Sequence, residues 1–278
     1  MDDAPFRLGN PGQGAPLAGA AVQGGAGRSL PATFAGGGLI GLGGAEFRLP
    51  LLIGAFRFAA LEAVIVNKAT SLVVVAFALL FRAGAVPLAE VVAHWPVLLN
   101  LLAGSLLGAW LGADWATQLR SERLYRVIAI MLVAIAAVLL LGHGVTAGEP
   151  LLAGAVQAAA GVAAGFGIGV VASTLGVAGG ELLIPTLVLL FGADIKLAGS
   201  LSLAVSLPTM LMGFARYSRD QSFAVLGRNR RFVLVMAAGS VAGTFLGGQL
   251  LGLVPGAALL PGLAAILLVS AIKVWRHR

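Results

Sequence analysis

Long apolar stretches recur along the whole sequence, and they restrict the possible folds more than any other feature. They cover residues 29–44, 61–81, 96–112, 123–142, 151–175, 181–191, 197–215, 232–252 and 257–275. Most approach the ~20 residues that a helix needs to cross the ~30 Å hydrocarbon core of a bilayer. Hydrophobic residues make up 59% of the chain and charged residues only 10%, unlike a soluble domain. The sequence therefore predicts an all-α polytopic membrane protein.

Residues 1–28 differ in composition, because they are rich in Gly, Pro and Ala and lack the apolar core of a signal peptide. We expect a flexible N-terminal tail there. The net charge of +7 comes mostly from Lys and Arg between the apolar runs, which indicates loops that fix topology and not a surface for nucleic acid. The chain has no cysteine, so it has neither disulfides nor thiolate metal sites.

Two stretches of the chain resemble each other at an offset of 135 residues. The matched pairs are Gly41 and Gly176, Gly44 and Gly179, Glu46 and Glu181, Pro50 and Pro185, and Phe56 and Phe191. A gap of six residues extends the similarity to residues 69–72 and 198–201. Repeats of this length suit transporters built from two structural halves. We therefore expect a first membrane repeat at residues 29–142 and a second at residues 151–278.

The distribution of Lys and Arg predicts how these halves are oriented. Basic residues collect around Arg120, in the loop 216–231 and at the C-terminus, which are expected in the cytoplasm. The loops 143–150 and 253–257 carry none and are expected outside. Counting crossings from these loops makes residues 151–191 leave the outer face and return to it as a broken helix hairpin. The same count inverts the first half, so we expect two inverted-topology repeats in the inner cell membrane.

Glycine clusters interrupt both hairpins and are candidate substrate-binding elements. The breaks contain Gly43, Gly44, Gly179 and Gly180. Glycine adopts positive φ and lets a ligand approach the backbone, and irregular backbone at membrane depth is tolerated only inside protein or beside a watery cavity. A short helix is expected after each break, with Pro50 or Pro185 in its first turn. The N-termini of these two half-helices would attract an anion.

Each break is followed by an acid, Glu46 in the first half and Glu181 in the second. One interpretation is that each carboxylate caps its own half-helix by accepting free N–H groups. The other is a proton-coupling role, because burial raises the pKa of a carboxyl group towards neutrality. Both interpretations can hold for the same residue.

Other polar residues lie within the predicted spans. Lys68, with Asn67 and Ser71, lies roughly 10 Å into helix 61–81 and could bind an anion, or Lys68 could extend to the cytoplasmic surface. Ser200 is a further candidate for substrate, although serine in membrane helices more often bonds backbone or a neighbouring helix. Arg48 could pair with Glu46, bind substrate or anchor the interface.

Catalysis is poorly supported by the sequence. The three histidines lie near loops or the C-terminus, and no HExxH or GxSxG motif occurs. We therefore expect neither an enzyme nor a bound cofactor or metal. The expected partners are a small anionic substrate and the lipid bilayer, with no nucleic acid, and a homodimer is left open.

The two glycine-rich stretches carry a resemblance to a known family. They read GLGGAEFRLPLL and GVAGGELLIPTLVLLFGADIKLAGSLSLAVSLP, and they are similar to the signature of the TauE/SafE family of membrane permeases, or sulfite exporters. The resemblance covers most of residues 30–275. It implies movement of sulfite, sulfoacetate or another small sulfur-containing or organic anion. The family pattern usually has a hydrophobic residue where Glu46 and Glu181 stand here.

Together these features favour a secondary transporter for a small anion. The predicted substrate is a sulfonate or sulfite, moved by alternating access with proton coupling. A passive channel or exporter is one alternative. The other is a membrane-embedded structural or assembly subunit without transport, in which the glycines serve packing alone.

Overall fold

A computed structural model describes residues 45–83, 86–141 and 150–250, together with positions 268, 271, 272 and 274. The helices in these ranges are α3 (Ala45–Gly54), α4 (Ala60–Arg82), α5 (Leu88–Ala93), α6 (Trp95–Gln118), α7 (Ser121–Leu141), α8 (Gly154–Leu175), α9 (Gly180–Phe191), α10 (Ile195–Tyr217), the 3-10 helix η2 (Gln221–Phe223), α11 (Ala224–Arg228) and α12 (Arg230–Leu250). No strand occurs in them. The predicted N-terminal tail, Gly43 and Gly44 lie outside the described residues.

The predicted apolar runs coincide with helices of membrane-spanning length. The predicted runs 61–81, 96–112 and 197–215 correspond to α4, α6 and α10, and most of the predicted ends agree with the helix ends within a few residues. By length and composition, α4, α6, α8 and α10 can each cross a bilayer, whereas α9 is shorter. At 1.5 Å per residue, the 12 residues of α9 extend only about 18 Å. The all-helical membrane class is therefore confirmed.

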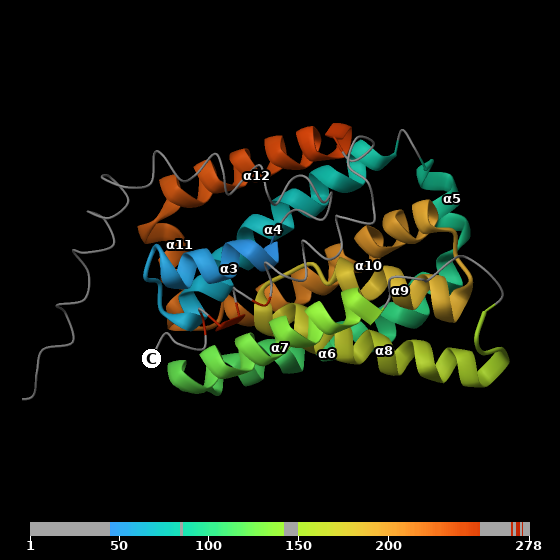
Figure 1. The fold of residues 1–278 in the computed structure, drawn as a ribbon, viewed down its shortest axis with the longest axis horizontal. Coiled ribbons are helices and arrows are strands. Elements are labelled where there is room, and N and C mark those ends of the chain that lie inside the picture. Colours follow the sequence, from blue (N-terminus) through green and yellow to red (C-terminus); the bar gives the residue numbers. More distant parts are fainter. Residues whose placement is uncertain are drawn as a thin grey trace, which may run out of the picture.

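The long helices lie roughly side by side along the long axis of the molecule (Figure 1). Helix α10 lies between α4 and α12 on one side and α6, α7 and α8 on the other (Figure 1). The short helices α5 and α11 lie at opposite ends of this bundle (Figure 1). A large part of α10 is buried, because other helices cover it on several sides.

Three helices in the first half begin 135 residues before helices in the second. Ala45 and Gly180 start α3 and α9, Ala60 and Ile195 start α4 and α10, and Trp95 and Arg230 start α6 and α12. Helices α4 and α10 each contain 23 residues. The starts of the helices can therefore be matched between the two halves without a gap. The sequence alignment, in contrast, needed a gap of six residues to match residues 69–72 with residues 198–201.

Contacts between the helices fix their directions. The end of α4 touches the beginning of α10, where Arg82 Nε donates to Ser200 Oγ at 3.3 Å, and Lys68 near the beginning of α4 lies beside Gly213 near the end of α10. Thus α4 and α10 run antiparallel. Helix α12 runs parallel to α4, since Met236 contacts Thr70 and Phe245 contacts Phe81.

Helix α6 is in turn parallel to α10. Ser105 Oγ is 2.7 Å from Thr209 Oγ1, and further along both helices Asp114 pairs with Arg216. Because α4 and α10 are antiparallel, α6 and α12 also point in opposite directions. The helices α4 and α10 start 135 residues apart, and so do α6 and α12. In each of these two pairs the helices therefore run in opposite directions.

Glycines bring α6 and α8 into close contact. They are Gly104, Gly108 and Gly112 on α6 and Gly161, Gly165 and Gly169 on α8. A Cβ built at Gly108 would lie 2.1 Å from the Phe166 carbonyl oxygen, and one at Gly169 would lie 2.3 Å from that of Ser105. Backbone-to-backbone approach of this kind is the common use of small residues between membrane helices.

Candidate functional site

The chain reverses direction between α8 and α9 in a glycine-rich turn. Gly176 and Gly179 adopt left-handed conformations with φ of 68° and 78°, which side chains with a Cβ rarely adopt. The Val177 N–H donates to the Ala172 carbonyl at 3.0 Å and closes the end of α8. At the far end of the pair, the Leu151 N–H donates to the Leu189 carbonyl at 3.0 Å. The residues just before α8 therefore lie beside the end of α9, and the two helices run in opposite directions.

This turn packs directly against α4. A Cβ at Gly176 would lie 2.4 Å from the Val64 carbonyl oxygen and 3.1 Å from the Lys68 backbone nitrogen. A Cβ built at Gly179 would lie 3.1 Å from the Ile168 side chain and 3.3 Å from that of Ala172. Gly176 is thus required by conformation and by space, and Gly179 by its conformation. The turn lies over the part of α4 that contains Lys68.

Pro50 and Pro185 lie deeper in their helices than the sequence predicted. Each is the sixth residue of its helix, α3 or α9, and not part of the first turn. In the second half the reason is that α9 begins directly at the glycine-rich turn, at Gly180 after the N-cap residue Gly179. An internal proline removes one backbone hydrogen bond, so each short helix is weakened at its second turn.

Lys68 is completely buried in the interior of the bundle. Its Nζ donates to the Ala172 carbonyl at 3.4 Å and to Ser173 Oγ at 3.3 Å, both in the last turn of α8. The carbonyl end of a helix attracts a cation, which partly compensates the ammonium charge. Within the described ranges Lys68 forms no ion pair. The side chain therefore does not extend to the cytoplasmic surface, which the sequence had left open.

Asn67 and Ser71 occupy a different face of α4 and join the two halves of the chain. Asn67 Nδ2 donates to the Ala45 carbonyl at 2.9 Å, at the start of α3, and to the Leu175 carbonyl at 3.2 Å, at the end of α8. Its Oδ1 accepts from Arg48 Nε at 3.1 Å, and Ser71 Oγ accepts from Arg48 Nη2. Asn67 is thus bonded to both glycine-rich regions.

Arg48 is a buried member of this network and not an interfacial anchor. Its side chain is only 4% exposed, and its Nη1 donates to Ser240 Oγ of α12 at 2.9 Å. The sequence analysis considered Arg48 but missed Ser240, because no local pattern brings α12 to α3. A second buried cation therefore lies on α3, bonded to α4 and α12.

The two acids lie at the second position of their short helices. Glu181, 8% exposed, is in the first turn of α9, directly after Gly180 and the N-cap residue Gly179. Next to it, the Ala178 carbonyl accepts from Ser206 Oγ of α10 at 2.7 Å. Glu46 is the second residue of α3, and its side chain lies outside the described atoms.

Ser200 is not brought to Lys68. It accepts from Arg82 Nε, and Arg82 Nη2 donates to the Lys196 carbonyl at 3.0 Å. Thirteen residues of α10, or about 20 Å of helix, separate Ser200 from Gly213 beside Lys68. The sequence missed Arg82, which stands at the last position of α4.

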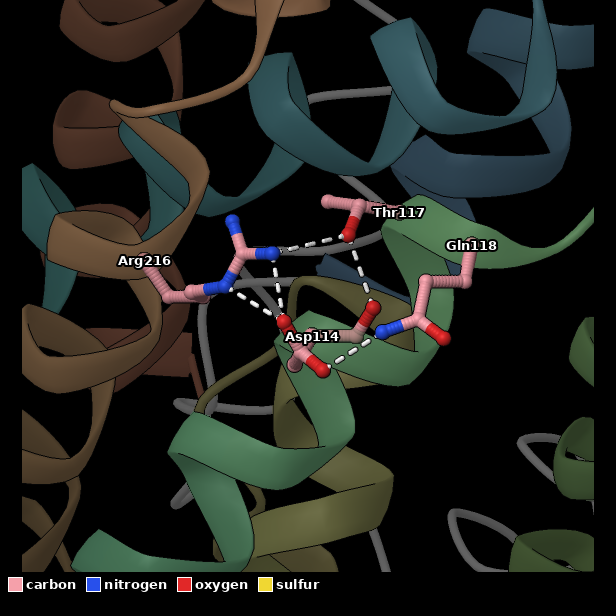
Figure 2. Close-up of polar contacts among 4 residues, drawn as sticks. All are labelled: Asp114, Thr117, Gln118 and Arg216. Atoms are coloured by element: carbon pink, nitrogen blue, oxygen red, sulfur yellow. Dashed lines mark hydrogen bonds and ion pairs between the residues drawn. The ribbon is translucent and has the colours of Figure 1, made fainter.

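An ion pair joins α6 to α10 at the end of the bundle where α11 also lies (Figures 1 and 2). Asp114 Oδ1 accepts from Arg216 Nε at 2.8 Å and from Nη2 at 2.5 Å. Thr117 Oγ1 accepts from Arg216 Nη2 at 3.3 Å, and Gln118 Nε2 donates to Asp114 Oδ2 at 2.6 Å (Figure 2). Only an acid two residues after the apolar run 96–112 signals this pair in the sequence, since its partner is 102 residues away.

The fold and these residues thus define the class of protein. It is a helical membrane protein in which two buried cationic side chains lie beside a glycine-rich turn. The comparison with protein families places the chain more narrowly. Residues 32–276 match the family described as "Sulfite exporter TauE/SafE", and the chain belongs to this family of membrane transporters. No curated protein and no solved structure matches the chain.

Proposed function

We propose that this family member is a secondary transporter that moves a small anion, sulfite or a sulfonate, by alternating access. The observation that carries the proposal is the burial of Lys68 without an ion pair in the described ranges. A buried charge without a counter-charge is costly, and an ionisable residue inside a membrane protein is by default a functional group. A bound anion would supply the missing negative charge.

The position of Lys68 supports a substrate site shared by the two halves. Lys68 belongs to α4 of the first half, whereas its neighbours Ala172, Ser173 and Gly213 belong to α8 and α10 of the second. Gly179 and Gly180 start α9 nearby, where free N–H groups favour anions. Asn67 and Ser71 would act from the neighbouring face of α4, through Arg48.

Alternating access requires two arrangements of the bundle. The opposite directions of α4 and α10, and of α6 and α12, support two inverted-topology repeats, the architecture that makes such arrangements equivalent by pseudo-symmetry. Lys68 is fully buried here, so an anion reaches it only after the helices around it separate. In this proposal the described conformation is an occluded one.

Glu46 and Glu181 are the proposed proton-coupling residues. Glu181 lies at the start of α9, next to the turn that packs on α4. A carboxyl group there would take up a proton in one access state and release it in the other. We place the protein in the inner cell membrane with the basic end, which includes Arg216 and Arg228, in the cytoplasm.

Uptake of radiolabelled sulfite into proteoliposomes tests this function. The wild type is expected to show saturable uptake that an inward proton gradient accelerates. Lys68→Gln should abolish it, whereas Lys196→Gln, which changes an exposed lysine on α10, should not. Absence of sulfite and sulfoacetate uptake in the wild type under every gradient would instead support a non-transporting subunit.

A further inference from the structure

The last turn of α8 offers a second polar group to the site at Lys68. We propose that the Ser173 hydroxyl binds the transported anion together with Lys68, and that Gly213 and Tyr217 of α10 set the position of that hydroxyl. The inference rests on the proposed function, because it requires an anion to reach Lys68. It adds three residues that the sequence analysis did not select.

The hydroxyl of Ser173 is available for a ligand. Ser173 is fully buried, and its Oγ accepts from Lys68 Nζ at 3.3 Å. In the described part of the chain this hydroxyl donates to no other residue, whereas the neighbouring Thr174 donates its hydroxyl to the Val170 carbonyl of its own helix at 2.8 Å. A serine hydroxyl rotates and can therefore donate to an anion bound to the ammonium group.

Gly213 provides the space in which these two groups meet. A Cβ built there would lie 2.4 Å from Ser173 Oγ, 2.8 Å from Lys68 Cε and 3.0 Å from Lys68 Nζ. Even a methyl group would therefore displace the ammonium group or the hydroxyl. The absence of a side chain at this position of α10 allows both polar groups to stay side by side.

Tyr217 fixes the same turn of α8 from one helical turn further along α10. It is fully buried, and its hydroxyl donates to the Ser173 carbonyl at 2.9 Å. Residues four apart lie on the same face of a helix, so Gly213 and Tyr217 face α8 together. Helix α10 thus carries both the space for the anion-binding groups and the hydrogen bond that positions Ser173.

This arrangement suits an oxyanion head group. A sulfite or sulfonate group presents several acceptor oxygens, so that one can accept from the ammonium group while another accepts from the hydroxyl. Loss of one such hydrogen bond to a charged ligand weakens binding about tenfold or somewhat more. Ser173 should therefore affect the apparent affinity for substrate more than the maximal rate.

The test uses the purified full chain in proteoliposomes, with labelled sulfite as the probe. Ser173→Ala should raise KM about tenfold with little change in Vmax, and the matched neighbour Thr174→Val should stay within twofold of wild type. Tyr217→Phe should raise KM severalfold, and it should add little in a Ser173→Ala background because it acts through Ser173. Gly213→Ala should reduce transport strongly, whereas Gly227→Ala, which meets no atom within 4 Å, should not.

The outcomes separate this inference from the function on which it rests. If the wild type shows no saturable sulfite uptake, the proposed function fails and this inference fails with it. If the wild type transports sulfite and Lys68→Gln does not, while Ser173→Ala and Tyr217→Phe keep the wild-type KM within twofold, Ser173 has no role in the anion site. Independent effects of Ser173→Ala and Tyr217→Phe that multiply in the double variant would refute the positioning role of Tyr217.

Discussion

Replacement of Lys68 by methionine separates an anion-binding role from a structural one. Methionine is apolar, flexible and similar in volume, so Lys68→Met removes the charge and leaves little cavity. Lys68 is the ninth residue of α4, about 12 Å along the helix, where a charged lysine costs about 2.5–3.5 kcal/mol on membrane-insertion scales. The substitution removes this cost.

The hydrogen bonds of the ammonium group offset part of this free-energy cost. The distances from Nζ to Ala172 O and Ser173 Oγ are 3.4 and 3.3 Å, longer than strong hydrogen bonds, and each contributes about 1 kcal/mol at most. Removing them together with the charge should raise the free energy of unfolding by about 1 kcal/mol. For a protein of this size this corresponds to an increase in Tm of roughly 2–4 °C.

Thermal unfolding in detergent, with and without sulfite, measures both effects. Sulfite at 100 times its Kd should stabilise the wild type by about 2.7 kcal/mol and should not stabilise Lys68→Met. Lys196→Met, at an exposed position, is the control and should change neither value. A loss of more than about 2 kcal/mol in Lys68→Met would show that Lys68 mainly caps α8, and sulfite stabilisation equal to wild type would refute its role in binding.

Three further substitutions test other parts of the account. Gly176→Ala should destabilise the protein by about 2–4 kcal/mol, since it combines a positive φ of 68° with a Cβ 2.4 Å from a backbone oxygen; an unchanged Tm would contradict this. Asp114→Ala leaves Arg216 unpaired and should lower stability by about 1–3 kcal/mol, and the double variant Asp114→Ala/Arg216→Ala should recover part of the loss, as a double-mutant cycle would reveal. Glu181→Gln should retain sulfite binding but lose acceleration of uptake by an inward proton gradient, and an uptake profile against pH equal to wild type would exclude Glu181 as the proton carrier.

The sequence predicted the features that depend on local patterns. Apolar runs of membrane length gave the positions of α4, α6 and α10, because helix length in a bilayer is set by its thickness. The glycine-rich reversal before α9 was also predictable, since positive φ at Gly176 and Gly179 requires this residue type. The position of Lys68 within α4 followed from the same pattern.

Contacts between distant helices could not be predicted in this way. Nothing local in the sequence assigns Ser240 to Arg48 or Tyr217 to Ser173, which are 192 and 44 residues apart. Ser200 illustrates the converse, because its place on α10 suggested a substrate group, yet the antiparallel packing brings it to Arg82 at the end of α4. The glycines of α6 are compatible with many partners, and only the structure shows that they face α8.

Counterflow of sulfite tests the central proposal, alternating access at a buried anion site, most directly. Proteoliposomes that contain the purified chain are loaded with excess unlabelled sulfite and diluted into a trace of labelled sulfite, with no other gradient. A carrier that exposes one site alternately to either side exchanges the two pools, so we predict transient accumulation of label above its equilibrium value and no accumulation for Lys68→Gln. Entry of label that only rises to equilibrium in the wild type would indicate a channel and would contradict the account.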